Sequence, residues 1–231
     1  MNIRHFHDWK VDYAGAARIQ KDLAGRVILR DRGLPDRISL VAGADVSYSR
    51  GDNVMYAAVV VLDFASMETV EESCRAVTVD FPYIPGLLSF REGPALLAAF
   101  GDLRTEPEVV LFDGQGIAHP RGLGLASHMG LLLDLPSIGC AKSRLCGEYD
   151  DVGCDRGDSS PLEHRGKRVG AVLRTKNRVK PLYISPGHNI SLESALEIVL
   201  SCCRGYRLPE PTRQAHLAVN RLRVMLRQSP R

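Results

Sequence analysis

Three acidic side chains in this sequence stand where they could do chemistry together. They are Asp45 in the segment VAGADVSYS, Glu92 in SFREG and Asp113 in VLFDGQG. Carboxylates held close together repel one another, so a buried group of them is costly unless a cation neutralises it. Oxygen ligands of this kind favour Mg²⁺ or Mn²⁺, and such an ion polarises a phosphodiester and lowers the pKa of an attacking water. The trio therefore predicts a Mg²⁺ site for phosphodiester chemistry, with Mn²⁺ as a substitute ion.

Each of the three acids also has an ordinary structural explanation. Asp113 and Gly114 form a common turn pair, and Asp45 can be a solvated carboxylate at a strand end. Glu92 can be a partner of a helix dipole. The metal site is favoured only because the expected topology brings all three residues to one rim of a sheet.

Two basic side chains are spaced so that they could assist the acids. Lys142 in GCAKS could hold a phosphate or the attacking water, and His216 in PTRQAH could shuttle a proton or bind a metal through water. A surface lysine and a histidine on a helix face are the alternatives.

The first third of the chain has the pattern of an antiparallel meander. An amphipathic helix is expected over residues 11–31. Three segments rich in β-forming residues follow at 39–49, 55–64 and 73–81, with a short turn at 50–53. Strands joined by turns this short pair as antiparallel neighbours.

The pattern then changes to alternating helices and strands. Helices are expected at 90–103, 122–134, 191–205 and 211–226, and extended segments at 108–116, 136–143, 168–176 and 181–189. The alternation of the first two helices with the first two extended segments implies parallel strands joined by right-handed crossovers. A meander followed by these units is the layout of a ribonuclease H-like α/β fold, with a mixed central sheet flanked by helices and residues 1–231 in one domain. With the first strand central and beside the fourth, Asp45, Glu92 and Asp113 converge on one end of the sheet.

Glycines are concentrated in DGQGIAHPRGLGLASHMG, residues 113–130. Gly114 and Gly116 follow a strand, and Gly122 and Gly124 open a helix, so the backbone can approach a ligand closely there. The spacing is not that of a dinucleotide-binding loop. A close-fitting pocket for a flat group is the better interpretation.

Two further segments suggest contact with a polyanion. SPGHNIS is expected to be a second glycine-bearing loop at a helix start, with Ser185, His188 and Asn189 as phosphate donors. Residues 164–180 carry seven Lys or Arg and no acid. Solvated faces are usually mixed in sign, so this run favours a partner such as nucleic acid.

Composition narrows the class of protein. The 231 residues are 45% hydrophobic, with a net charge of +3, which allows a sizeable core and is only mildly basic. No segment approaches the roughly 18 apolar residues of a membrane span, and MNIRHFHDWK lacks the apolar run of a secretory signal. The six cysteines show no regular framework, so reduced thiols and a cytoplasmic protein are expected. Zinc at Cys146, Cys154 and His164 is the weaker alternative, because their spacing matches no tight ligand pattern.

Residues 81–92, FPYIPGLLSFRE, form an unusual apolar segment. Pro82 and Pro85 forbid both a helix interior and a central strand. Tyr83 and Ile84 lie between them, although loops usually lie in water and are polar. The sequence therefore predicts a stiff loop that holds an aromatic and a branched side chain at the surface. Burial of the loop tip against another element is the alternative.

Taken together, these segments resemble endonuclease V, a family of nucleases that repair deaminated bases. The resemblance rests on GADVSY, PYIPGLLSFRE, DGQGIAHPRGLGLASHMG, GCAKS, SPGHNIS and LPEPTRQAH, which occur in this order. Residues 143–170 carry no motif of the family. The resemblance implies a Mg²⁺-dependent hydrolase, of the deoxyribonuclease V type, that acts on DNA containing deoxyinosine. It would cut the second phosphodiester bond on the 3′ side of the lesion, leave 3′-hydroxyl and 5′-phosphate ends, and act as a monomer.

The resemblance also implies roles for individual residues. Asp45 and Asp113 match the metal-binding aspartates, Glu92 the third acid, and Lys142 and His216 the remaining polar residues of the active site. The wedge that enters the duplex beside the lesion is matched by Pro82, Tyr83, Ile84 and Pro85. The pocket for the everted base is matched by the backbone around Gly86, Leu88, Gly114, His119 and Gly124.

Three other functions stay open from the sequence. A non-catalytic nucleic-acid-binding module would keep the basic surface and the wedge but would not need the acidic trio. A small-molecule phosphate-binding enzyme would use the glycine loops but would not need an exposed Pro-Tyr-Ile-Pro segment. An inosine-directed RNA endonuclease of the same family is the nearest alternative, because the metal chemistry is indifferent to the sugar while the substrate channel decides.

Overall fold

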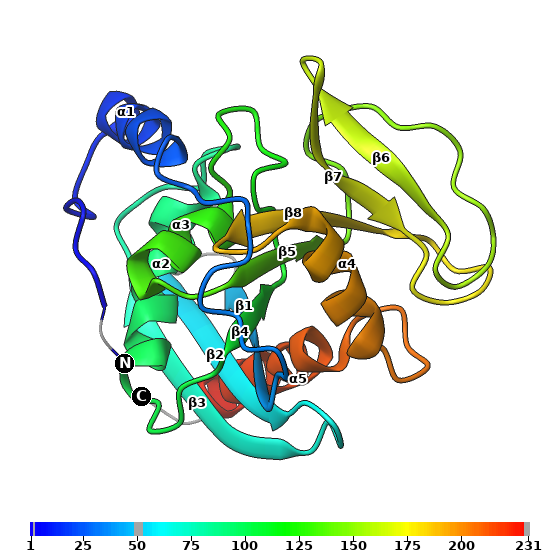
Figure 1. Ribbon diagram of the computed structural model, residues 1–231. Helices are drawn as coiled ribbons and strands as arrows, with labels where there is room; N and C mark the ends of the chain where they lie inside the picture. The colour runs from blue at the N-terminus through cyan, green and yellow to red at the C-terminus, as the bar shows by residue number, and fades with distance from the viewer. Residues whose placement is uncertain (2, 49–52, 229–231) are drawn as a thin grey trace.

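A mixed eight-stranded sheet forms the centre of the computed structural model, which describes residues 1, 3–48 and 53–228 (Figure 1). The strands are β1 (Leu40–Tyr48), β2 (Val54–Asp63), β3 (Thr69–Thr78), β4 (Val109–Phe112), β5 (Ser137–Ala141), β6 (Ser159–His164), β7 (Lys167–Leu173) and β8 (Leu182–His188). The helices are α1 (Tyr13–Ala24), α2 (Leu88–Gly101), α3 (Leu125–Leu133), α4 (Leu192–Ser201) and α5 (Glu210–Gln228). Among these helices, none is both long enough and apolar enough to cross a bilayer.

The order of the strands across the sheet is β3-β2-β1-β4-β5-β8-β7-β6. The first three form the expected antiparallel meander, and β1, β4 and β5 are parallel neighbours. The pairs β5–β8, β8–β7 and β7–β6 are antiparallel. The predicted α/β class, with a mixed sheet flanked by helices, is therefore confirmed.

Helices cover both faces of the sheet. On one face α2 and α3 pack on alternate residues of the central strands, such as Ala42 and Val110. On the other face α4 and α5 pack on residues such as Val41 and Leu111, which are one position away along the same strands. Successive side chains of a strand point to opposite faces, so central strands buried on both sides must be apolar throughout. The run MYAAVVVL, residues 55–62 of β2, meets this requirement.

Two expected elements differ from the structure. The helix expected over residues 11–31 ends at Ala24, and the N–H of the next residue, Gly25, donates to the Leu23 carbonyl. The strand β6 was not expected, since Pro161 and alternating polar residues disguise it. It is the edge strand of the sheet, where a missing N–H is tolerated. The turn expected at 50–53 lies largely outside the described residues.

The strand directions fix which loops share an edge of the sheet. The C-terminal ends of β1, β4 and β5 lie at one edge, since these strands are parallel. The antiparallel pairs Ala141↔Tyr183 and Leu173↔Leu182 bring the loop of residues 174–181 to that same edge. We call this edge the active edge, because it holds Asp45, Asp113 and Lys142.

Candidate active site

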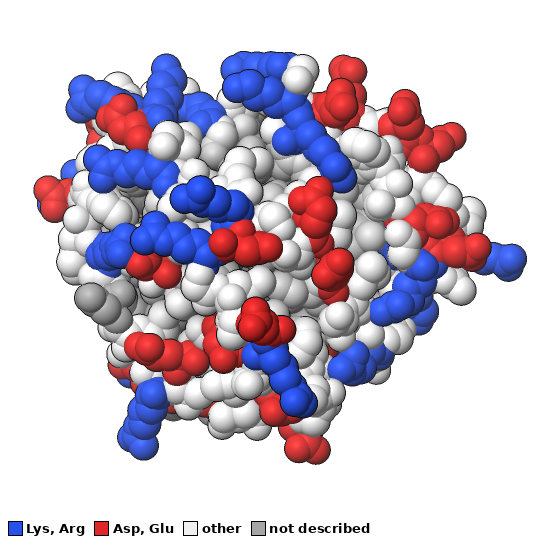
Figure 2. Space-filling model, viewed as in Figure 1, with Lys and Arg blue, Asp and Glu red and all other residues white. Residues whose placement is uncertain are grey.

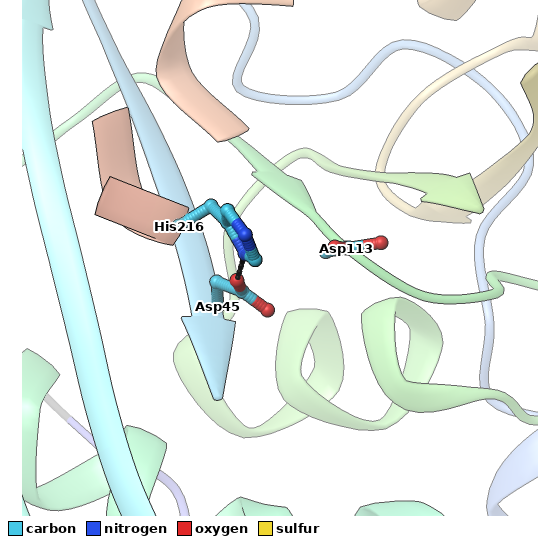
Figure 3. A group of neighbouring side chains, drawn as sticks. All are labelled: Asp45, Asp113 and His216. Carbon is cyan, nitrogen blue, oxygen red and sulfur yellow. Dashed lines mark hydrogen bonds and ion pairs between the residues drawn. The ribbon is translucent and has the colours of Figure 1, made fainter. Parts of the chain in front are cut away.

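Asp45, Asp113 and His216 meet at the active edge (Figure 3). Ala44 of β1 is paired with Phe112 of β4, so the next residues along the chain, Asp45 and Asp113, are neighbours. His216 comes from α5, and its Nδ1 donates a hydrogen bond of 2.7 Å to Asp45 Oδ2. One ligand atom from each of the three residues lies within 4.8 Å of the others. In the described part of the chain, no other set of three His, Cys, Asp or Glu side chains meets this way, and Cys146, Cys154 and His164 do not.

The carboxylates of the site destabilise one another. Burial, and then the charge of Asp113, raise the pKa of Asp45, while the hydrogen bond from His216 and the charge of Lys142 act in the opposite direction. Burial, and then the charges of Asp45 and Asp113, raise the pKa of Glu92 well above its ordinary value. Lys142 Nζ forms an ion pair with Asp113 Oδ2. A divalent cation among these groups would relieve the repulsion.

Glu92 lies deeper than the sequence suggested. The helix α2 begins at Leu88, so Glu92 falls beyond its first turn, and no acidic residue occupies that turn. The side chain is only 8% exposed and faces the two aspartates closely enough for their charges to raise its pKa. A role as partner of the helix dipole does not fit this position, because that effect is confined to the first turn.

Gly43 allows α5 to reach the site. Gly43 and Asp45 lie two positions apart on β1, so both face α5. A Cβ atom built on Gly43 would lie 2.6 Å from the Thr212 backbone nitrogen and closer still to the Pro211 carbonyl oxygen. The start of α5 therefore rests on the bare backbone of β1. This contact sets the distance between His216 and Asp45.

The segment between the two prolines is exposed, as expected for a stiff surface loop. Tyr83 is 62% exposed, and Pro82 and Pro85 are also exposed. Ile84 is half-buried against the small apolar cluster of Ala16, Phe81, Leu87 and Phe90. The Leu87 N–H donates to the Ile84 carbonyl over 2.9 Å, and Gly86 adopts a φ of +78° in the turn between them. The tip thus projects while its base is anchored.

A pocket of about 410 Å³ joins this loop to the acidic group. Its wall includes all five residues expected to form the base pocket, namely Gly86, Leu88, Gly114, His119 and Gly124. Asp113, Lys142 and the exposed Tyr83 also line it. A Cβ atom on Gly124 would lie 2.6 Å from the Gly116 carbonyl oxygen, so the backbone there is as closely packed as the glycine-rich sequence suggested.

His119 is neutral and fixed in the wall of this pocket. Burial lowers its pKa to about 4. Its Nε2 donates to the Gly86 carbonyl over 2.9 Å, and its Nδ1 accepts from the Arg121 N–H over 3.1 Å. Two residues that the sequence did not single out complete the contact: Arg121 Nη2 and Gln20 Nε2 also donate to the Gly86 carbonyl, over 2.6 and 3.0 Å. The only sequence signal for Gln20 was a polar residue on the buried face of α1.

The segment SPGHNIS differs from its expected form. Residues 185–188 belong to β8, in agreement with the extended segment expected at 181–189, and do not form the glycine-bearing loop that was also expected there. Ser185, His188 and Asn189 are all at most 3% exposed. Ser185 Oγ accepts from the Gly116 N–H over 2.8 Å, and His188 Nδ1 accepts from the Ile28 N–H over 3.2 Å. Their burial leaves no surface for a phosphate, so we do not include them in the site.

The basic run of residues 164–180 divides into two parts. Arg174 is internal, since its guanidinium donates to the carbonyls of Val152, Gly153 and Val179. Lys176, Arg178 and Lys180 are exposed in the loop at the active edge. The face seen in Figure 2 has no single basic patch: Lys and Arg gather at the upper left, over α1, and mix with Asp and Glu on the right.

Comparison with known proteins identifies relatives over almost the whole chain. The family model for endonuclease V matches residues 21–217. An endonuclease V of Gloeobacter violaceus is 50% identical over 94% of this chain and 89% of its own. The crystal structure of Streptomyces avermitilis endonuclease V has a TM-score of 0.90 and 41% identity, covering 98% of this chain and 99% of its own. The Ciona intestinalis endonuclease V, solved with DNA containing an inosine followed by a ribo-adenosine, has a TM-score of 0.81 and 28% identity, covering 92% of this chain and 98% of its own.

Proposed function

Because the chain belongs to the endonuclease V family and is an endonuclease that hydrolyses phosphodiester bonds, we propose that its substrate is DNA containing deoxyinosine. The cut falls at the second phosphodiester bond on the 3′ side of the lesion and leaves 3′-hydroxyl and 5′-phosphate ends. Residues 1–231 form one catalytic domain that acts as a monomer. The relative from Ciona intestinalis, solved with inosine-containing DNA, supports this choice of substrate.

The observation that carries the proposal is the position of the acidic group at the wall of the pocket. Asp113 and Lys142 line the same pocket as Tyr83, so a base in the pocket brings its own strand to the acids. A pocket without the acids would bind a base but would not cleave the strand, and acids without the pocket would cleave DNA without selecting a base. The two together fit an enzyme that cleaves close to a recognised base.

The donor set fits a divalent cation. Asp45 and Asp113 offer carboxylate oxygens, the donors that Mg²⁺ and Mn²⁺ prefer, and Glu92 adds a third, buried carboxyl group whose charged form a bound cation would favour. When bound, Mg²⁺ supplies Lewis-acid polarisation of the phosphodiester and a more acidic water. His216 orients the Asp45 carboxylate through Nδ1, and its Nε2, which accepts from Asn220, can take up or release a proton. Lys142 holds a phosphate oxygen or the attacking water beside Asp113.

The loop and the pocket have separate roles in recognising the lesion: the loop enters the duplex, and the pocket holds the everted base. Extrusion of a base costs about a few kcal/mol of unstacking, least when the base is mispaired. The segment Pro82–Pro85 is stiff and already exposed, so it can enter the duplex with little further loss of conformational freedom. The everted base then lies against the backbone of Gly114 and Gly124, where the absence of side chains lets neighbouring segments pack closely into the pocket wall.

One experiment tests the proposal. An oligonucleotide with a single inosine is prepared as DNA and as RNA and is incubated with the protein, once with Mg²⁺ and once with a chelator. The same DNA with adenosine at that position is the control. We expect a nick two bonds to the 3′ side of inosine in DNA, with the stated ends, that disappears with the chelator. Cleavage of the RNA alone would show that the substrate is inosine-containing RNA and not DNA. Equal cleavage of the adenosine control would refute lesion recognition.

A further inference from the structure

Arg144 is an unassigned side chain at the mouth of the pocket. It lies in the loop that follows β5, is exposed, and lines the same pocket as Tyr83 and Lys142. Some exposed arginines are ion-paired, as Arg4 is with Asp134 and Arg221 with Glu72. Within the described residues, the Arg144 guanidinium has no carboxylate partner at ion-pair distance. It lies instead over the aromatic ring of Tyr149.

One tyrosine lies under this guanidinium, and a second tyrosine supports the first. Arg144 Cζ lies 5.7 Å from the centre of the Tyr149 ring. The Tyr149 and Tyr183 hydroxyl groups are hydrogen-bonded over 3.1 Å, and their rings meet edge to face with centres 5.7 Å apart. Tyr183 is paired with Ala141 across β5 and β8, so both side chains point to the same face of the sheet. Since Ala141 lines the pocket, the pair anchors Arg144 to the sheet directly beside it.

The charges around Arg144 indicate what it faces. The positive groups that act on the Tyr183 hydroxyl are Arg144 and Arg207, and Arg207 also donates to the Lys142 carbonyl over 2.9 Å. On the other side, Glu148 and Asp150 flank Tyr149 and line the neighbouring hollow. These acids disfavour a phosphate near the guanidinium but do not disfavour an uncharged nucleobase. A guanidinium backed by an aromatic ring is a flat surface on which a base can stack.

We infer that Arg144 stacks against an unpaired base of the substrate next to the everted one, with Tyr149 and Tyr183 as positioning residues. This rests on the proposed function. A base that leaves the stack deprives its neighbour of one stacking partner, and a flat group at the mouth of the pocket can replace that partner. Arg144 and Tyr83 then serve different bases: Tyr83 enters the duplex, and Arg144 retains the strand that leads into the pocket.

Binding of single-stranded inosine DNA, measured by fluorescence anisotropy with a chelator present, tests the inference. Arg144→Lys keeps the charge but removes the planar group, and Arg4→Lys at the remote ion pair is the matched control. We expect Arg144→Lys to weaken binding about tenfold, which is the size of one base-stacking interaction, and Arg4→Lys to leave it unchanged. The nicking rate at saturating substrate should be retained by Arg144→Lys, because Arg144 does not touch the acids. Tyr149→Phe keeps the ring and should lose less affinity than Tyr149→Leu.

Abasic substitutions in the oligonucleotide identify the base. Each nucleotide flanking the inosine is replaced in turn by an abasic site. At one position the wild type should lose about as much affinity as Arg144→Lys loses, and Arg144→Lys should lose nothing further. Additive losses at every position, or wild-type binding by Arg144→Lys with a loss only in Arg144→Ala, would overturn stacking and leave a charge interaction. A wild type that does not prefer inosine to adenosine would overturn the proposed function and this inference together.

Discussion

Replacing Gly43 by alanine perturbs the contact that holds α5 against β1. The added Cβ would lie 2.6 Å from the Thr212 nitrogen and nearer to the Pro211 carbonyl oxygen, whereas real Cβ atoms essentially never come within 3.0 Å of a heavy atom of a residue that is not adjacent in the chain. Both neighbours are backbone atoms and cannot rotate away. The start of α5 must therefore move away from β1 by about 1 Å.

The consequences for stability and activity can be given separately. Overpacking of this kind costs about 1–3 kcal/mol, which for a chain of this size lowers Tm by about 2–12 °C. His216 is part of α5, so the same movement lengthens its 2.7 Å hydrogen bond to Asp45 beyond bonding distance. A hydrogen bond to a charged group contributes about 1.5–3 kcal/mol. The nicking rate should therefore fall about 10- to 100-fold.

Calorimetry and single-turnover nicking of inosine DNA measure the two effects. Gly101→Ala is the matched control, because a Cβ there would meet only the Ile3 side chain at 3.9 Å and alanine favours a helix. The control should keep or raise Tm and should keep the rate. A Gly43→Ala protein with the Tm and the rate of the wild type would refute the close approach of α5 to β1 and its role in placing His216.

Three further predictions concern the substrate surface and the pocket. Tyr83→Ala should weaken binding to duplex inosine DNA by about 1–3 kcal/mol, and should weaken binding to single strands less, because no partner base has to be held apart there. Equal effects on both substrates would mean that Tyr83 only packs its loop. Replacing Lys176 and Arg178 by glutamine should make the logarithm of the affinity fall less steeply with the logarithm of the salt concentration, by about one unit of slope for each phosphate that is no longer neutralised. An unchanged slope would show that these two side chains face solvent and do not contact phosphates. The folded pKa of His119 is about 4 against 6.5 when unfolded, so unfolded chains bind the proton first as the pH falls. The contribution of His119 to the free energy of unfolding, about 3 kcal/mol, is therefore fully present above pH 6.5 and is lost as the pH falls towards 4. His119→Asn should remove that part of the pH dependence in urea unfolding at pH 7 and 4.5, and an undiminished slope would show that His119 titrates freely.

The expected neighbourhood of Asp45 and Asp113 followed from periodicity and topology. A strand in VAGADVSYS and a parallel strand in VLFDGQG, placed side by side, necessarily bring residues 45 and 113 to one edge, and the register confirms it. The pocket could also be predicted, because the glycines in the segment 113–130 allow the backbone to approach a ligand or another segment closely. Their roles in catalysis and base binding stay proposals.

Other features depend on tertiary interactions that no local pattern encodes. SPGH was expected both at the end of an extended segment and in a glycine-bearing loop, because proline and glycine break strands. In the structure Pro186 sits where the β5–β8 register shifts, with its carbonyl accepting from Ile117, and a Cβ on Gly187 would collide with Ser137. The hydrogen bond of Gln20 to Gly86 joins residues 66 positions apart. Arg144, Tyr149 and Tyr183 meet only because β8 runs beside β5.

The premise of the proposed mechanism is that Asp45 and Asp113 hold the metal ion, and a calorimetric titration with Mn²⁺ tests it. Wild type, Asp113→Asn and Asp102→Asn are titrated under the same conditions, the last as a control because Asp102 is ion-paired with Arg75, away from the site. We expect the wild type and the control to bind Mn²⁺ alike and Asp113→Asn to bind at least about tenfold more weakly, since it loses one charged ligand. Equal binding by all three proteins would contradict the metal site.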